Sequence, residues 1–211
     1  ASLPEGEKEE ARDRGLRFSD EDAESRIYAG KEPKSRVALL YSGPYDWSVE
    51  NNHRLSSLTS MLQIRLRELI REESGGTYGV SVSNSTHKLH EQEYTLWVSF
   101  TCEPDRAEEL IEMVDKELSR VAKEELEAEY AEKVRQKQLS DWEESREENS
   151  YWRGTLSASV QYDIPIDTLL NKRERIDRLS PSYLRRSAED YLSGATRLEL
   201  ILYPEGRAGE E

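Results

Sequence analysis

One long amphipathic segment constrains the fold of this chain more than any other feature. Over residues 49–73, five leucines recur at helical spacing and therefore share one face: Leu55, Leu58, Leu62, Leu66 and Leu69. The Gly75-Gly76 pair follows, and glycine readily takes the left-handed conformation that ends a helix. A helix with such an apolar stripe needs a second layer of structure to cover it.

Strand patterns flank this predicted helix. Residues 78–83 and 94–102 are rich in apolar residues and are joined by a polar loop, which predicts an antiparallel hairpin. In the second segment a mixed set of residues alternates with an apolar set, which consists of Tyr94, Leu96, Val98 and Phe100. Shorter apolar segments at about 26–28, 37–41 and 197–203 predict three further strands.

The remaining periodic segments predict helices at 104–121, 124–147, 151–161, 166–179 and 181–192. The element order is then β-β-α-β-β-α-α-α-α-α-β. It predicts an α+β fold with a mixed, largely antiparallel sheet and helices packed on one face. We expect residues 1–24 to be a linker or arm from a preceding domain, 25–205 the folded domain and 206–211 a polar tail. The start at Ala1, without an initiator Met, suggests a fragment of a longer protein.

Composition argues against two classes of partner. The formal net charge of −14 disfavours nucleic acid, whose phosphates would be repelled, and an anionic membrane face. The single cysteine, Cys102, ends an apolar strand and is predicted to be a packed thiol rather than a nucleophile.

The three histidines do not form a zinc motif. His87 and His90 lie three apart in the polar loop, where they would not share a helical face, so we expect solvated loop residues. His53 lies near the start of the long helix and is expected at the surface. The chain also lacks a Gly-x-Ser-x-Gly elbow and a phosphate-binding loop.

Arg71 and Tyr78 are the candidate functional residues. On residue types alone, Arg71 is a cation at a helix C-terminus and Tyr78 an ordinary strand residue. Alternatively, the guanidinium and the phenol are two hydrogen-bond donors directed at one peptide carbonyl. If negative charge develops on that oxygen, the same donors would stabilise the transition state.

The segment from Arg67 to Val82, which contains both residues, resembles the non-catalytic region of pitrilysin/insulinase-type zinc peptidases, in particular the large bacterial PqqL-like proteases. Four further segments resemble that family in the same order along the chain: 30–35, 99–105, 147–152 and 202–205. The resemblance extends from about residue 25 to 205. It implies the domain fold of pitrilysin and the mitochondrial processing peptidase.

The resemblance also implies a division of labour. Such enzymes have two halves around a peptide chamber, one half carrying zinc on a His-x-x-Glu-His motif. The other half contributes an Arg and a Tyr that hold the substrate backbone, which correspond here to Arg71 and Tyr78. This chain lacks the motif, so we expect it to bind no zinc and to be inactive alone. Zinc would lie in a catalytic half, in the same polypeptide or in a partner subunit.

The implied function is thus a substrate-binding, non-catalytic domain of a zinc metalloendopeptidase, with a peptide as the substrate. Relatives suggest the periplasm or cell envelope for the full-length protein. One alternative is an inert scaffold or assembly domain of the same family. Another is an independent peptide-binding module, although half a chamber would leave its ligand exposed.

Overall fold

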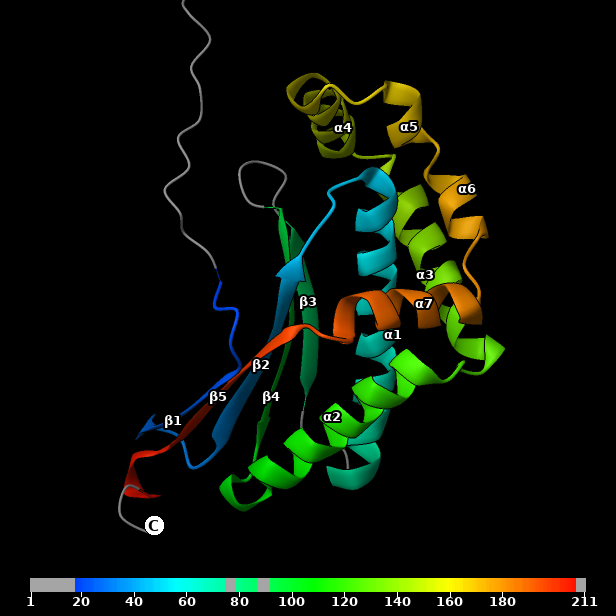
Figure 1. Cartoon of the computed structure of the whole chain (residues 1–211). Coiled ribbons are helices and arrows are strands. Elements are labelled where there is room, and N and C mark those ends of the chain that lie inside the picture. The colour runs from blue at the N-terminus through cyan, green and yellow to red at the C-terminus, as the bar shows by residue number, and fades with distance from the viewer. Residues whose placement is uncertain (1–17, 75–78, 87–91, 208–211) are drawn as a thin grey trace, which may run out of the picture.

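The computed structural model describes residues 18–74, 79–86 and 92–207. Their framework is one five-stranded sheet in the order β1-β5-β2-β4-β3, with helices on one face (Figure 1). The strands are β1 (Ala23–Gly30), β2 (Ser35–Pro44), β3 (Val80–Thr86), β4 (Glu93–Cys102) and β5 (Thr196–Pro204). Among the strand pairs of the described residues only β1–β5 is parallel, so the predicted mixed, largely antiparallel sheet is confirmed.

The helices are α1 (Val49–Ser74), α2 (Ala107–Lys123), α3 (Ala128–Ser145), α4 (Asn149–Tyr162), α5 (Ile166–Leu170), α6 (Lys172–Asp177) and α7 (Pro181–Leu192). Single 3₁₀ turns cover Pro104–Arg106 and Glu205–Arg207. The expected single helix over 166–179 is wrong. The Arg175 side chain donates to the carbonyls of Thr168 and Leu169, so carbonyls near the end of α5 bond a side chain instead of a further helical turn.

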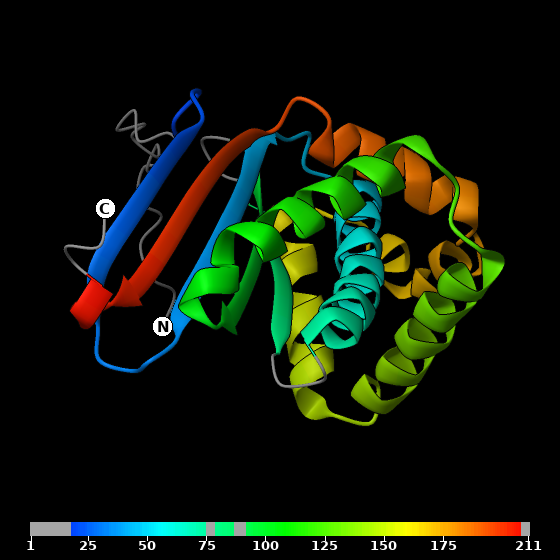
Figure 2. The ribbon, with the colours of Figure 1, turned by 90° about the horizontal axis from the view of Figure 1, so that it is seen from below.

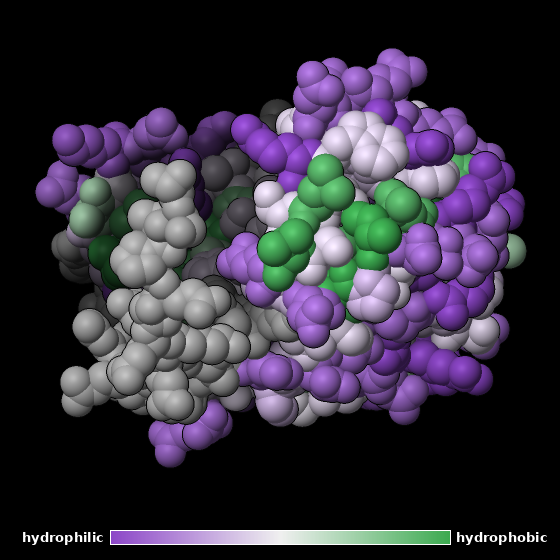
Figure 3. Space-filling view, turned by 90° about the horizontal axis from the view of Figure 1, so that it is seen from above, coloured by the Kyte–Doolittle hydropathy of each residue, from purple (hydrophilic) through white to green (hydrophobic). Residues whose placement is uncertain are grey.

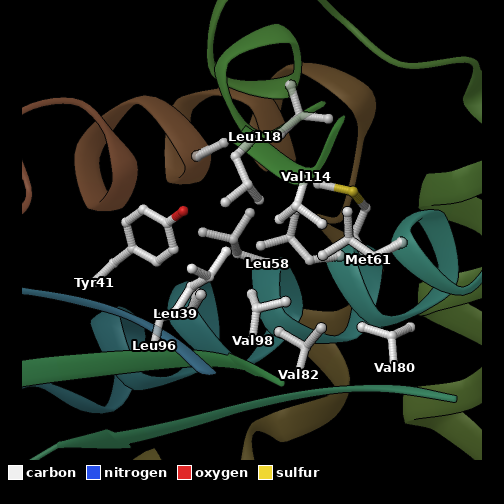
Figure 4. Packing of buried hydrophobic residues seen from close by; sticks show 14 of the residues in the cluster. Leu39, Tyr41, Leu58, Met61, Val80, Val82, Leu96, Val98, Val114 and Leu118 are labelled. Atoms are coloured by element: carbon white, nitrogen blue, oxygen red, sulfur yellow. The ribbon is translucent and has the colours of Figure 1, made fainter. Parts of the chain in front are cut away.

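The core lies between the sheet and α1 with α2. Figure 4 shows side chains from β2, β3 and β4 directed at Leu58 and Met61 of α1 and at Val114 and Leu118 of α2. Four of the five stripe leucines are fully buried: Leu55, Leu58, Leu62 and Leu66. Full burial of such a side chain is worth about 1.5–3 kcal/mol, so this stripe is a main source of stability.

A second layer of helices covers α1 on its other side. In Figure 2, α1 lies between the sheet and α3, and α1 also packs against α7. This arrangement buries His53, which is only 7% exposed, so the expectation of a surface histidine is wrong. The leucine stripe identified one buried face of α1 and gave no signal of the second.

Both ends of α7 have residues typical of helix ends. Ser180 caps α7 by accepting a hydrogen bond from the Tyr183 N–H at 3.2 Å, and Gly194 follows that helix with φ of 81°.

Cys102 is buried, as predicted, and burial raises the pKa of its thiol to about 11. Within the described ranges, no helix is long and apolar enough to cross a membrane.

The predicted domain limits remain predictions. Strand β1 begins at Ala23, within the range 1–24 that we assigned to a linker. Residues 1–17 and 208–211 lie outside the described residues, as do the Gly75-Gly76 turn and the loop with His87 and His90.

Candidate functional site

Arg71 lies in the last turn of α1 and its side chain is exposed. With the residues that the structure describes, it forms no hydrogen bond and no ion pair. The unpaired carbonyls of a helix C-terminus favour a cation at this position. Tyr78 lies outside the described residues, in the segment between the end of α1 at Ser74 and the start of β3 at Val80.

Arg65, less than two turns earlier, is held tightly. Its Nε donates to a Glu117 carboxylate oxygen of α2 at 2.9 Å, and Arg120 donates to the same carboxylate at 2.8 Å. Burial by itself would raise the pKa of Glu117. The hydrogen bonds and charges of the two arginines outweigh this effect, so the pKa of Glu117 is lowered. The buried carboxylate therefore links α1 to α2 in its ionised form.

Tyr130 links the same part of α1 to α3. Its hydroxyl donates to Glu68 at 2.6 Å and accepts a hydrogen bond from Arg65. The Arg65 guanidinium also lies 4.7 Å from the centre of the Tyr130 ring, within the range of a cation–π contact. Together with Glu117, these contacts fix the helix that presents Arg71.

Gln63 fixes the opposite side of α1. Its side-chain amide bonds the backbone of β3 at Val80 and Val82. The sequence carried no signal for this contact, because a glutamine beside a leucine stripe does not reveal which backbone it meets. The same holds for Tyr130, whose partners come from another helix.

The side chains of the described residues do not fit a catalytic metal. Throughout the described part of the chain, no group of three or more His, Cys, Asp or Glu residues is placed to hold a metal ion. His53 is buried, and its Nε2 finds no hydrogen-bond partner within the described part of the chain. Burial lowers the pKa of His53 to about 4, so the imidazole is neutral near pH 7.

Two basic residues, Lys172 and Arg175, lie near His53. Burial and the charge of Arg175 lower the pKa of Lys172, and burial lowers that of Arg175. The neighbouring cleft has a volume of about 450 Å³ and is lined by Arg175 and Arg178 as well as the carboxylates of Glu174 and Asp177. Since both signs of charge line it, the cleft does not select one class of ligand.

An apolar surface lies at the end of the molecule where α1 begins. Helix α4 has no buried residue, and it exposes Trp152, Leu156 and Val160, which recur at helical spacing. Figure 3 shows hydrophobic residues gathered on this end, where Figure 1 places α4 and α5. Helix α1 begins near this end and carries Arg71 in its last turn, so the surface is separate from Arg71.

Comparison with known proteins identifies the family. A sequence model described as the peptidase M16 inactive domain matches residues 1–138, more than half of the chain. A curated protein described as the probable zinc protease PqqL of Haemophilus influenzae is 27% identical over 93 residues, which are 44% of this chain and 10% of that protein. The resemblance to zinc peptidases of this type is thereby confirmed at the level of the family.

Solved structures show the same fold. The periplasmic protease PqqL from Escherichia coli superposes with a TM-score of 0.77 at 18% identity, covering 92% of this chain and 22% of that one. The first half of the same protease superposes with a TM-score of 0.70 at 15% identity, covering 95% and 46%. This chain therefore spans only a fraction of each relative, and a related fold also occurs within that first half.

Proposed function

This chain belongs to the M16 peptidase inactive-domain family, and from that premise we propose that it is the substrate-holding, non-catalytic domain of a zinc metalloendopeptidase. Its partner is a zinc-bearing half, in the same polypeptide or in a separate subunit. The two halves enclose the peptide, and Arg71 and Tyr78 donate hydrogen bonds to its backbone.

The state of Arg71 carries this proposal. The Arg65 side chain donates hydrogen bonds to Glu117 and Tyr130, whereas Arg71 is exposed and has no partner among the described residues. The helix that bears it is held by α2 and α3 on one side and by β3 on the other. Because the helix backbone is already fixed, binding a ligand orders the Arg71 side chain without the further cost of ordering the backbone that bears it.

The chemistry of the two side chains suits a peptide backbone. A guanidinium and a phenol both donate hydrogen bonds, and peptide carbonyls accept them. Zinc in the other half would polarise the scissile carbonyl and activate water. The two residues of this chain would orient the peptide, and Tyr78 would also donate to the oxygen as it gains negative charge.

A reconstitution experiment tests the proposal against a scaffold role. Zinc content and cleavage of a fluorogenic peptide are measured for this domain, for the zinc-bearing half and for both together. We expect zinc only in the other half, and full turnover only when both are present. A scaffold domain would leave the turnover of the zinc-bearing half unchanged. Zinc bound stoichiometrically by this domain alone would contradict our assignment.

A further inference from the structure

The outer edge of β3 is closed by a side chain of α1. The Nε2 of Gln63 donates to the Val80 carbonyl at 3.0 Å, and its Oε1 accepts from the Val82 N–H at 2.9 Å. Strand β3 is the last strand of the sheet, and β4 pairs with its other side. One amide that bonds residues i and i+2 of a strand reproduces the pattern of a parallel neighbour.

Two further side-chain contacts join α1 to β3, and together with that of Gln63 they form a seam along the strand. The Asn84 amide donates to the Thr59 hydroxyl at 2.8 Å. Further on, the Thr86 hydroxyl donates to the Asn52 side-chain oxygen at 3.0 Å. As the residue numbers rise along α1 they fall along β3, so the two elements run in opposite directions.

The lengths of the two elements match along this seam. From Asn52 to Gln63 the helix rises about 16 Å. From Thr86 to the midpoint of Val80 and Val82 the strand spans about 17 Å. Because the spacings agree, all the bonds of the seam form together, and they fix the register of the strand against the helix.

Gln63 lies at the end of this seam nearest to Arg71. It precedes Arg71 by about two helical turns, and its partner Val80 is the first residue of β3. The ties that hold α1 beyond Gln63, through Arg65 and Glu68, lead to α2 and α3 instead of β3. Of these three contacts between α1 and β3, the one through Gln63 therefore lies nearest to Arg71.

We propose that Gln63 is a positioning residue for the substrate clamp, by which we mean the proposed donors Arg71 and Tyr78, because it holds the start of β3 at a fixed place against the Arg71 end of α1. This inference rests on the proposed function and goes one step beyond it. Gln63 also occupies backbone groups that an added peptide strand would need at Val80 and Val82. The peptide must accordingly be held near this point by side-chain donors rather than by extension of the sheet.

The experiment compares two glutamines in the assembled two-half enzyme. Gln63→Met keeps the volume and removes both hydrogen bonds to β3. Gln138→Met is the matched control, since Gln138 ties the same helix to α3 through Ser57 at 2.9 Å without touching β3. We expect Gln63→Met to lower kcat/KM about tenfold, mainly through kcat, because a small misplacement weakens transition-state contacts most. Gln138→Met should stay within about twofold of the parent, even where its melting temperature falls equally.

Combination with Arg71→Ala separates the possible failures. If Gln63 acts through the clamp, Gln63→Met in the Arg71→Ala background changes kcat/KM by less than about twofold. An Arg71→Ala enzyme with normal kcat/KM would overturn the proposed function itself. If Arg71→Ala is impaired but Gln63→Met and Gln138→Met have equal kcat/KM values, only the role of Gln63 is overturned. The same holds if Gln63→Met and Arg71→Ala lower kcat/KM independently, so that their effects multiply.

A second variant covers the case in which Gln63→Met does not fold. Gln63→Lys keeps a donor for the Val80 carbonyl and loses the acceptor for the Val82 N–H. We expect kcat/KM between those of the parent and Arg71→Ala. A folded Gln63→Lys enzyme with the parent kcat/KM would contradict the inference.

Discussion

The Nε of Arg65 and a carboxylate oxygen of Glu117 lie 2.9 Å apart, although the two residues come from different helices. The Glu117 side chain is only 8% exposed and is shared with Arg120. Two guanidinium groups thus compensate one buried carboxylate, which would otherwise be strongly destabilising. The helix that presents Arg71 depends on this arrangement.

Glu117→Gln should destabilise the domain. The amide retains hydrogen-bonding capacity but loses the charge that both arginines face, so we expect the free energy of unfolding to fall by about 2 kcal/mol. Glu112→Gln is the control, because Glu112 pairs with Lys116 on the surface, at side-chain exposures of 71% and 76%. It should change stability by less than about 0.5 kcal/mol. Equal losses in urea denaturation would contradict a special role for Glu117.

The burial of His53 predicts a pH dependence of stability. Its pKa falls to about 4 in the folded protein, against an ordinary value of 6.5. Above that ordinary value the imidazole is neutral in both states. As the pH falls towards 4 the unfolded chain takes up a proton that the folded protein excludes, so stability is lost by on the order of 3 kcal/mol.

The effect follows from the groups around His53. Burial is the main cause of the lowered pKa, the charges of Arg175 and Lys172 add to it, and a backbone hydrogen bond at Arg175 and the Glu50 carboxylate act in the opposite direction. We expect His53→Gln to flatten the decline in stability between pH 6.5 and 4, measured by urea denaturation at several pH values. Parallel curves for the parent and the variant would refute this account.

Arg175→Met tests the boundary between α5 and α6. The substitution removes the donors to the Thr168 and Leu169 carbonyls, at 2.7 and 3.4 Å, while keeping an unbranched side chain. Loss of these hydrogen bonds lowers stability, and removal of a buried charge offsets part of that loss. We therefore expect the free energy of unfolding to fall by about 1–2 kcal/mol, measured by thermal unfolding. Arg173→Met is the control, since Arg173 is exposed and pairs only with Asp177 in the described structure. A neutral Arg175→Met would show that these carbonyls are satisfied in another way.

Two glycines should respond to alanine in opposite directions. A Cβ on Gly30 would lie 2.8 Å from the Tyr203 carbonyl oxygen of β5, too close without backbone movement. Gly30→Ala should therefore lower stability by about 1–3 kcal/mol and weaken the β1–β5 pair. Gly154 lies within α4 with open space around it, so Gly154→Ala should raise stability by about 0.5–1 kcal/mol. A raised melting temperature for Gly30→Ala, or a lowered one for Gly154→Ala, would contradict the assignment of that glycine.

Local sequence patterns predicted much of the fold, because the residues that define each element are close in the chain. The spacing of Leu55 to Leu66 identified α1, and the alternation from Tyr94 to Phe100 identified β4. The burial of His53 could not be predicted, since it depends on α1 being covered on two sides. The break near Asn171 escaped prediction because a later arginine, Arg175, bonds carbonyls of α5.

The candidate site shows the same limit. The sequence placed Arg71 at the end of a helix, as the structure finds. It did not reveal Gln63 or Tyr130, whose partners are distant in the chain. A functional pair can be proposed from residue types and spacing, whereas the side chains that hold its elements follow from tertiary packing.

Peptidase kinetics of clamp variants in the assembled enzyme test the central claim most directly. Arg71→Ala should lower kcat/KM roughly ten- to hundredfold, as expected for loss of a charged hydrogen bond to the substrate. Tyr78→Phe should lower kcat by about a hundredfold or more, with the fold intact. Arg67→Ala, one turn earlier on α1 and also exposed, should remain within about twofold of the parent. Parent-like kinetics for both Arg71→Ala and Tyr78→Phe, or an equal loss in Arg67→Ala, would contradict the clamp.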